Sequence, residues 1–147
     1  MSNVSIIQFL LENMALHKSI TMSSTHTSFQ ASYCNDGVIG QMCHTWSSLT
    51  GWVRIDLGGR QIVTCIIIHN RITTDLALRR RLSNTDLYVF DNEDPNDNRR
   101  LCAHIEDGEP LEVFARCTKP LFARNVELLQ PSIGVNRAIN ICEISVY

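Results

Sequence analysis

The sequence predicts a single all-β domain of the sandwich or barrel class, and three observations support this prediction. Apolar residues alternate along "WVRIDLG" (52–58), and "VTCIIIH" (63–69) is a continuous β-branched run, typical of a strand buried on both faces. Clusters of Gly, Pro, Asn and Asp separate these apolar segments from the next ones. No segment has the period of a long helix, and 147 residues suit one domain with one core.

The remaining strands follow in chain order, and turn-forming residues bound each of them. They are "TDLYVF" (85–90), "LEVFA" (111–115), "NVELL" (125–129) and "INICEISVY" (139–147). Turns are expected at "LGGRQ" (57–61), "DNEDPNDNRR" (91–100), "EDGEP" (106–110) and "QPSIGVNR" (130–137). The acidic loop at 91–100 could suggest a metal site or paired catalytic acids. It lacks the central glycine and terminal glutamate of an EF-hand, so a solvated turn between two strands is expected. Functional loops are expected at the ends of the sandwich.

Composition excludes several classes of protein. Hydrophobic residues make up 44% of the chain and charged residues 19%, which argues against disorder. A net charge of −2 argues against nucleic acid as the main partner. No apolar stretch approaches the roughly 20 residues of a membrane span. The apolar run from Ile6 to Leu11 lacks a basic segment before it and a small-residue cleavage site after it, so it is a poor signal peptide; a strand or helical turn packed on the domain is expected there.

The six cysteines indicate in which cellular compartment the protein folds. None forms a C-x-x-C pair, so neither a zinc ribbon nor a thioredoxin-like motif is indicated. An even number at wide spacing in a small domain favours disulfides and an extracellular setting. Reduced cysteines in the core of a cytosolic protein are the alternative. The spacing alone does not select a connectivity.

Five sequence pieces occur in one order: "ENMALHKSITMSS" (12–24), "NDG" (35–37), "GWVRIDLGG" (51–59), "IIIHNR" (66–71) and "CEISVY" (142–147). Together they resemble the F-type lectin family, fucose-binding lectins built on a discoidin-like β-sandwich, or jelly roll, with binding loops at one end. The resemblance covers residues 12–147 of one domain spanning 1–147. The family-specific motif is a histidine followed, after 26 residues, by an arginine, and 26 residues lie between His44 and Arg71.

The resemblance implies that His44, Arg71 and Arg81 contact L-fucose. A guanidinium is a rigid, planar fork of N–H donors that never deprotonates, so two of them and one imidazole can read the orientation of neighbouring hydroxyls. Arg81 matches the family's second arginine because a leucine follows it, and Arg79 is the competing choice. Asp75 matches the acidic residue that orients an arginine.

The loop between Arg71 and Arg81 is three residues longer than the family pattern and lacks its adjacent cysteines. Leu76 or Leu78 would then supply the apolar face for the sugar ring. In the alternative interpretation, His44 is a strand-end histidine, Arg71 pairs with Asp75 on the surface, and residues 79–81 are a solvated turn.

The resemblance also implies a structural calcium ion. Asp36 and Glu143 match two of its carboxylate ligands, and hard oxygen ligands suit Ca²⁺. The remaining ligands would be backbone carbonyls, namely those of Tyr33, Val38, Met42 and Cys142.

Two disulfides follow from the same resemblance, Cys43–Cys142 and Cys102–Cys117. Cys34 and Cys65 have no implied partner, so they either bond each other or stay free.

These observations predict a secreted, non-enzymatic lectin that binds fucosylated glycans in cell recognition, without membrane insertion. Homo-oligomers would raise its avidity. The first alternative is a discoidin-type adhesion module that binds protein or lipid through apolar loop tips; the tips in this sequence look mostly polar. A glycosidase has only the acidic loop in its favour, and the sequence lacks G-x-S-x-G, a Gly-rich phosphate loop and H-E-x-x-H.

Overall fold

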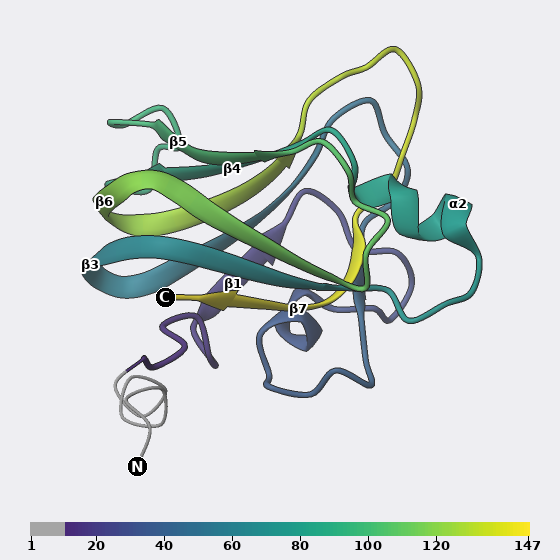
Figure 1. Cartoon of the computed structure of the whole chain (residues 1–147), viewed down its shortest axis with the longest axis horizontal. Coiled ribbons are helices and arrows are strands. Elements are labelled where there is room, and N and C mark those ends of the chain that lie inside the picture. Colours follow the sequence, from purple (N-terminus) through teal and green to yellow (C-terminus); the bar gives the residue numbers. More distant parts are fainter. Residues whose placement is uncertain (1–10) are drawn as a thin grey trace.

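The computed structural model describes residues 11–147, which form a sandwich of antiparallel strands (Figure 1). Seven strands make one hydrogen-bonded sheet that folds over on itself, in the order β2-β7-β3-β6-β4-β5, with β1 paired to β3. The strands are β1 (Ser19–Met22), β2 (Cys43–His44), β3 (Gly51–Asn70), β4 (Thr85–Phe90), β5 (Arg100–Ile105), β6 (Glu112–Gln130) and β7 (Asn140–Val146). The helices are η1 (Ala31–Cys34), α2 (Leu76–Arg79) and η2 (Arg80–Leu82). The predicted all-β sandwich is confirmed.

The strand or helical turn predicted from Ile6 to Leu11 lies outside the described residues except for Leu11. Within residues 11–147, no helix is both long and apolar enough to cross a membrane.

Two long strands organise the sandwich. The sequence predicts a turn at 57–61 and separate strands at 111–115 and 125–129, and both predictions are wrong. β3 runs unbroken for 20 residues and β6 for 19. The two strands pair with each other on both sides of their bends, so the pair belongs to both layers of the sandwich. Between Asp56 and Gln61 the register shifts and Gly58 takes a positive φ of 83°, so the chain bends where a turn was expected. The bends of β3 and β6 lie at one end of the molecule and α2 at the other (Figure 1).

The charged segment 91–99 is a solvated turn between β4 and β5, as predicted. Its carboxylates bond within the turn and its flanks: Asp91 accepts from Arg100 and Asn98. β4 occupies the same residues, 85–90, that the sequence indicates.

The core lies between the layers and is built mainly from aliphatic side chains of the strands, with Phe90. The largest fully buried ones are Ile55, Leu57, Ile66, Ile68, Phe90, Leu87, Leu128, Ile139, Ile141 and Ile144. Cys102 on β5 is bonded to Cys117 on β6, the pairing that the family resemblance implies.

A buried carboxylate holds together the outer face of the layer that contains β4. Glu127 on β6 is 1% exposed and bonds Arg54 Nε at 2.6 Å and Arg99 Nη2 at 2.9 Å. Each arginine also lies over an aromatic ring, Arg54 over Trp52 at 3.7 Å and Arg99 over Tyr88 at 3.8 Å. Three strands and the segment before β5 therefore meet at one carboxyl group.

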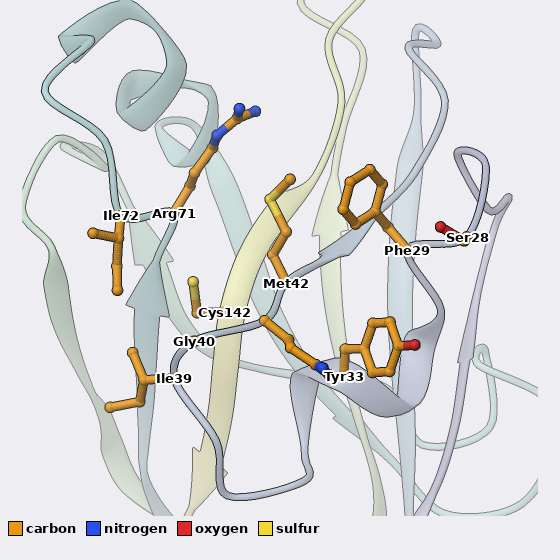
Figure 2. A pocket seen from close by; sticks show the side chains of 10 residues that line it. Ser28, Phe29, Tyr33, Ile39, Gly40, Met42, Arg71, Ile72 and Cys142 are labelled. Carbon is orange, nitrogen blue, oxygen red and sulfur yellow. The ribbon is translucent and has the colours of Figure 1, made fainter.

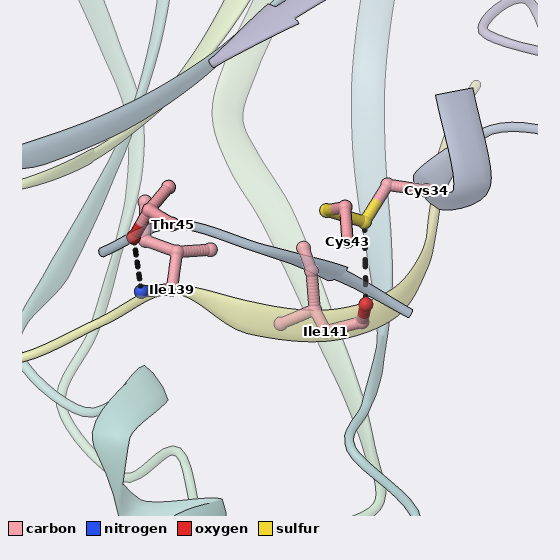
Figure 3. Close-up of a disulfide and its surroundings, with 5 residues drawn as sticks. All are labelled: Cys34, Cys43, Thr45, Ile139 and Ile141. Carbon is pink, nitrogen blue, oxygen red and sulfur yellow. Dashed lines mark hydrogen bonds between the residues drawn. A yellow bond between two sulfur atoms is a disulfide. The ribbon is translucent and has the colours of Figure 1, made fainter. Parts of the chain in front are cut away.

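The Cys43–Cys142 disulfide is not formed, and that prediction is wrong. Cys43 lies opposite Ile141 in the ladder of β2 and β7, and successive side chains alternate between faces, so Cys142 points to the other face. Cys34, at the end of η1, reaches Cys43 at a Cα–Cα distance of 5.4 Å and bonds it (Figure 3). Cys65 and Cys142 are free thiols, and burial raises the pKa of both.

Candidate functional site

His44 ends β2 and is 8% exposed. Its Nδ1 donates to the Thr45 carbonyl at 2.6 Å, because a carbonyl can only accept. Burial lowers the pKa of His44, the Thr45 contact opposes this, and His26, Arg81 and Arg71 lower it further. A neutral imidazole with its proton on Nδ1 presents Nε2 as a hydrogen-bond acceptor.

Arg71 follows β3 directly, and a register shift between His69 and Asn70 sets its direction. The Asn70 side chain fixes this corner: its Oδ1 accepts from the Arg71 amide at 2.8 Å, and its Nδ2 donates to the carbonyls of Arg79 and Gly108. Among the described residues, the Arg71 guanidinium has no hydrogen bond or ion pair. Its donors are available to a ligand.

Arg81 lies in η2, and its backbone is held from two sides. Gln130 Nε2 donates to the Arg81 carbonyl at 2.6 Å, and the buried Arg137 donates to the carbonyls of Ser83 and Asn84. In the described part of the chain the Arg81 guanidinium bonds no other group. Arg71 lines the same pocket as Phe29, whose ring lies 6.0 Å from His44, and the charges of both Arg81 and Arg71 lower the pKa of His44.

The other two predicted residues have scaffold roles. Arg79 Nε donates to the Glu109 carbonyl at 2.6 Å, which connects the end of α2 to the segment between β5 and β6. Asp75 is the N-cap of α2 and accepts from the amides of Ala77 and Leu78, so the prediction that it orients an arginine is wrong. No Arg71–Asp75 ion pair occurs among residues 11–147, which also removes the simple surface-pair interpretation.

An aromatic cluster that sequence reasoning missed adjoins His44. His26 stacks on His44 at 4.6 Å between ring centroids, Phe29 lies 6.0 Å from His44, and Trp46 lies 4.1 Å from His26. The signal in the sequence is weak, because His26 and Phe29 lie outside any predicted strand and become neighbours of His44 only through the fold. Aromatic rings beside polar donors offer a sugar its two needs, an apolar face and hydrogen bonds.

A pocket of about 390 Å³ opens beside Arg71 (Figure 2). In this view the side chains of Arg71, Met42 and Phe29 point the same way, with Met42 between the other two, and the buried free Cys142 also lines the pocket. Tyr33, Ile39, Gly40 and Ile72 complete most of its wall. The pocket brings together three of the predicted calcium-ligand residues, Tyr33, Met42 and Cys142, with one predicted sugar contact.

Asp36 and Glu143, the two predicted carboxylate ligands of calcium, lie on either side of the hydrogen bond from the Gly37 amide to Glu143. Glu143 is 3% exposed; its Oε1 accepts from the Gly37 amide at 3.1 Å, and its Oε2 is buried with no partner among the described residues. Burial first, opposed by the Gly37 bond, and then the Asp36 carboxylate raise the pKa of Glu143 to about 7. No group of three or more His, Cys, Asp or Glu side chains gathers among residues 11–147, so a cation here would need oxygen ligands of other kinds as well. Two carboxylates that act on each other's charge, one with an unpaired buried oxygen, fit a hard cation.

Gly108 sets how closely the 106–110 loop approaches η2, and Gly108→Ala should disturb the site. An added Cβ would lie 2.4 Å from the Leu82 carbonyl carbon and the Ser83 amide nitrogen, directly after Arg81. We expect a loss of about 1–3 kcal/mol in unfolding free energy, measured by thermal melting, and weaker sugar binding because η2 must shift. Gly59→Ala is the matched control, since nothing lies within 4 Å of its added Cβ. Equal melting temperatures for the two variants would contradict the close approach.

Comparisons with solved structures identify similar folds. A fucose-binding module from Streptococcus pneumoniae is 27% identical, with a TM-score of 0.75 and coverage of 93% of this chain and 98% of that one. A fucolectin from striped bass (Morone saxatilis) serum is 26% identical, with a TM-score of 0.78; the match covers 92% of this chain and 47% of the fish lectin. The lectin domain of lectinolysin, solved with Lewis b antigen, superposes with a TM-score of 0.77 at 23% identity, covering 92% of this chain and 96% of that one. No family model and no curated protein matches the sequence.

Proposed function

We propose that this chain, whose fold is the discoidin-like β-sandwich of the F-type lectins, binds L-fucose and fucosylated glycans through His44, Arg71 and Arg81. The observation that supports the proposal is a pair of guanidinium groups that bond no described residue: Arg71 lines the pocket beside Phe29 and the buried His44, and the charges of both Arg71 and Arg81 act on the pKa of His44. We place the protein outside the cell, in glycan-mediated recognition; its two disulfides support that compartment.

The site offers both donors and an acceptor to a sugar hydroxyl. A sugar hydroxyl donates one hydrogen bond and accepts others. His44 Nε2 would accept a hydrogen bond from the sugar hydroxyl, while Arg71 and Arg81 would donate hydrogen bonds to sugar oxygens. Two planar forks and one ring nitrogen fix where neighbouring oxygens must lie, which selects one sugar stereochemistry.

Calorimetric titration with L-fucose tests the proposal, with its mirror image D-fucose as the matched control. A monosaccharide makes few contacts, so we expect a Kd on the order of micromolar to millimolar for L-fucose and much weaker binding of D-fucose. Clustering or homo-oligomerisation would then supply avidity. Equal affinity for the two sugars, or no heat at millimolar concentration, would refute the site.

We also propose that Asp36 and Glu143 hold a calcium ion, with carbonyls of Tyr33, Val38, Met42 and Cys142 as the further ligands. The unpaired Glu143 Oε2 supports this, as does the effect of the Asp36 charge on the Glu143 pKa, with no arginine or lysine paired to either carboxylate among the described residues. Bound calcium would compensate the repulsion between the carboxylates and fix the 35–42 loop. It would have no part in contacting the sugar.

Removing calcium is expected to lower the melting temperature, because a ligand that binds only the native state stabilises it by mass action. Melting should be followed in calcium and in EDTA, for the wild type and for Asp36→Asn. The wild type should lose several degrees in EDTA, while Asp36→Asn should melt at nearly the same temperature in both. If the wild-type melting temperature is unchanged after metal removal has been confirmed, the calcium site is ruled out.

A second candidate function follows from apolar side chains on the loops. The sequence predicts mostly polar loop tips, yet several large apolar side chains are 39–64% exposed in the connecting segments: Trp46, Leu49, Ile72, Leu76, Ile133 and Val135. Such residues favour an adhesion module that binds protein or lipid. Co-sedimentation with anionic vesicles, with and without L-fucose, separates this candidate from the lectin.

A further inference from the structure

Trp46 stands next to the proposed fucose site without being part of it. Its side chain is 52% exposed, although a tryptophan side chain usually buries most of its area. Its only aromatic contact in the described chain is His26, at 4.1 Å and an interplanar angle of 57°. Much of the indole therefore faces solvent, and its N–H has no partner among residues 11–147.

The position of Trp46 is fixed by its backbone. Segments 24–26 and 44–46 run side by side, since the His26 amide donates to the His44 carbonyl at 2.8 Å and the Trp46 amide donates to Ser24 Oγ at 3.0 Å. Thr45, between His44 and Trp46 in the chain, makes two hydrogen bonds to Ile139 on the segment leading into β7. The Thr45 amide donates to the Ile139 carbonyl, and the Thr45 hydroxyl accepts from the Ile139 amide, the bond drawn in Figure 3. These hydrogen bonds hold the backbone at Trp46, and His26 packs against its ring, which lowers the cost of ordering the indole on a ligand.

The three rings form a row, with His26 between His44 and Trp46. His26 lies 4.6 Å from His44 and 4.1 Å from Trp46. Trp46 is therefore one ring removed from the histidine that would bind fucose. That separation suits the next sugar unit of a chain better than the fucose itself.

We infer that Trp46 forms a second subsite, a platform for the sugar unit linked to fucose, so that the ligand is a fucosylated oligosaccharide rather than the free monosaccharide. This inference rests on the proposed function of the His44 site. The apolar C–H face of a sugar ring would pack on the indole face, and the indole N–H would donate to one of its hydroxyls. Rigid, partly exposed Trp residues of this kind dominate many binding surfaces.

Calorimetry with L-fucose and with a fucosylated trisaccharide tests the inference. The wild type should bind the trisaccharide about tenfold more tightly than fucose. Trp46→Ala should lose that gain while binding fucose within about twofold of the wild type, and Trp46→Phe should keep part of it. Leu49→Ala is the matched control, because Leu49 lies in the same loop, is 50% exposed and carries no aromatic ring. It should behave as the wild type.

The outcomes separate the two proposals. If the wild type binds neither sugar, the fucose site itself is refuted. If the wild type binds both sugars equally, or if Trp46→Ala keeps the full gain, the second subsite is refuted and the fucose site stands. If Trp46→Ala loses both sugars while its circular dichroism is unchanged, Trp46 belongs to the fucose site and the platform is overturned.

Discussion

Arg71→Ala and Arg81→Ala are each expected to abolish detectable binding of L-fucose while leaving the fold intact. Neither guanidinium bonds another described residue, so its removal costs the fold little. A lost charge-assisted hydrogen bond costs about 1.5–3 kcal/mol, which is roughly a tenfold to hundredfold loss of affinity. From a weak starting affinity, that loss exceeds what calorimetry detects. Arg71→Lys should fail as well, because a point ammonium cannot reproduce the planar fork.

Arg80→Ala is the matched control for these variants. It removes the same charge next to Arg81, but its side chain is 58% exposed and pairs with Glu109 Oε2. Its fucose affinity should stay within about twofold, since an exposed ion pair contributes little. Arg79→Ala should mainly lower the melting temperature, because Arg79 holds the Glu109 carbonyl. Full binding by Arg71→Ala, or loss on Arg79→Ala with retention on Arg81→Ala, would show that the contact residues are wrongly assigned.

Glu127→Ala is expected to give the largest loss of stability, about 3 kcal/mol in unfolding free energy, or about 6–12 °C in melting temperature. The substitution leaves Arg54 and Arg99 without their shared carboxylate, and Arg99 Nε is already buried without a partner among the described residues. Both arginines are 28% exposed, so they can turn partly toward solvent, which keeps the loss below that of a fully buried pair.

Glu112→Ala on the same strand is the control for that experiment. Its carboxylate is 45% exposed and lies 3.4 Å from His69, so its removal should change stability by less than about 0.5 kcal/mol. Chemical denaturation of both variants gives the comparison. A Glu127→Ala protein that unfolds at the wild-type denaturant concentration would show that the cluster contributes nothing.

Strand identity was predictable because it is local. The alternation in 85–90 and the β-branched run in 63–69 each encode a face to be buried, and both segments are strands. The bend at Gly58 was not predictable, because "LGGRQ" has the composition of a turn and only the pairing of β3 with β6 decides between a turn and a bend.

Long-range placement was predictable only in part. The spacing of His44 and Arg71 carried the family resemblance, and the charges of Arg71 and Arg81 both lower the pKa of His44. The partner of Cys43 depends on which face of β7 each side chain occupies, and a register shift of one residue reverses that. The roles of Asp75 and Arg79 depend on a three-residue loop extension whose short helix, α2, supplies new backbone amides to cap.

The place of β7 has a consequence for how the chain matures. β7 is the last strand in chain order, yet it lies between β2 and β3 and pairs with both. During synthesis β2 therefore lacks its ladder partner until residues 140–146 have emerged, and the apolar edge of β3 stays uncovered for the same interval. The nascent domain would thus be exposed to aggregation until its final segment inserts, and it would reach its binding-competent form in one late, cooperative step.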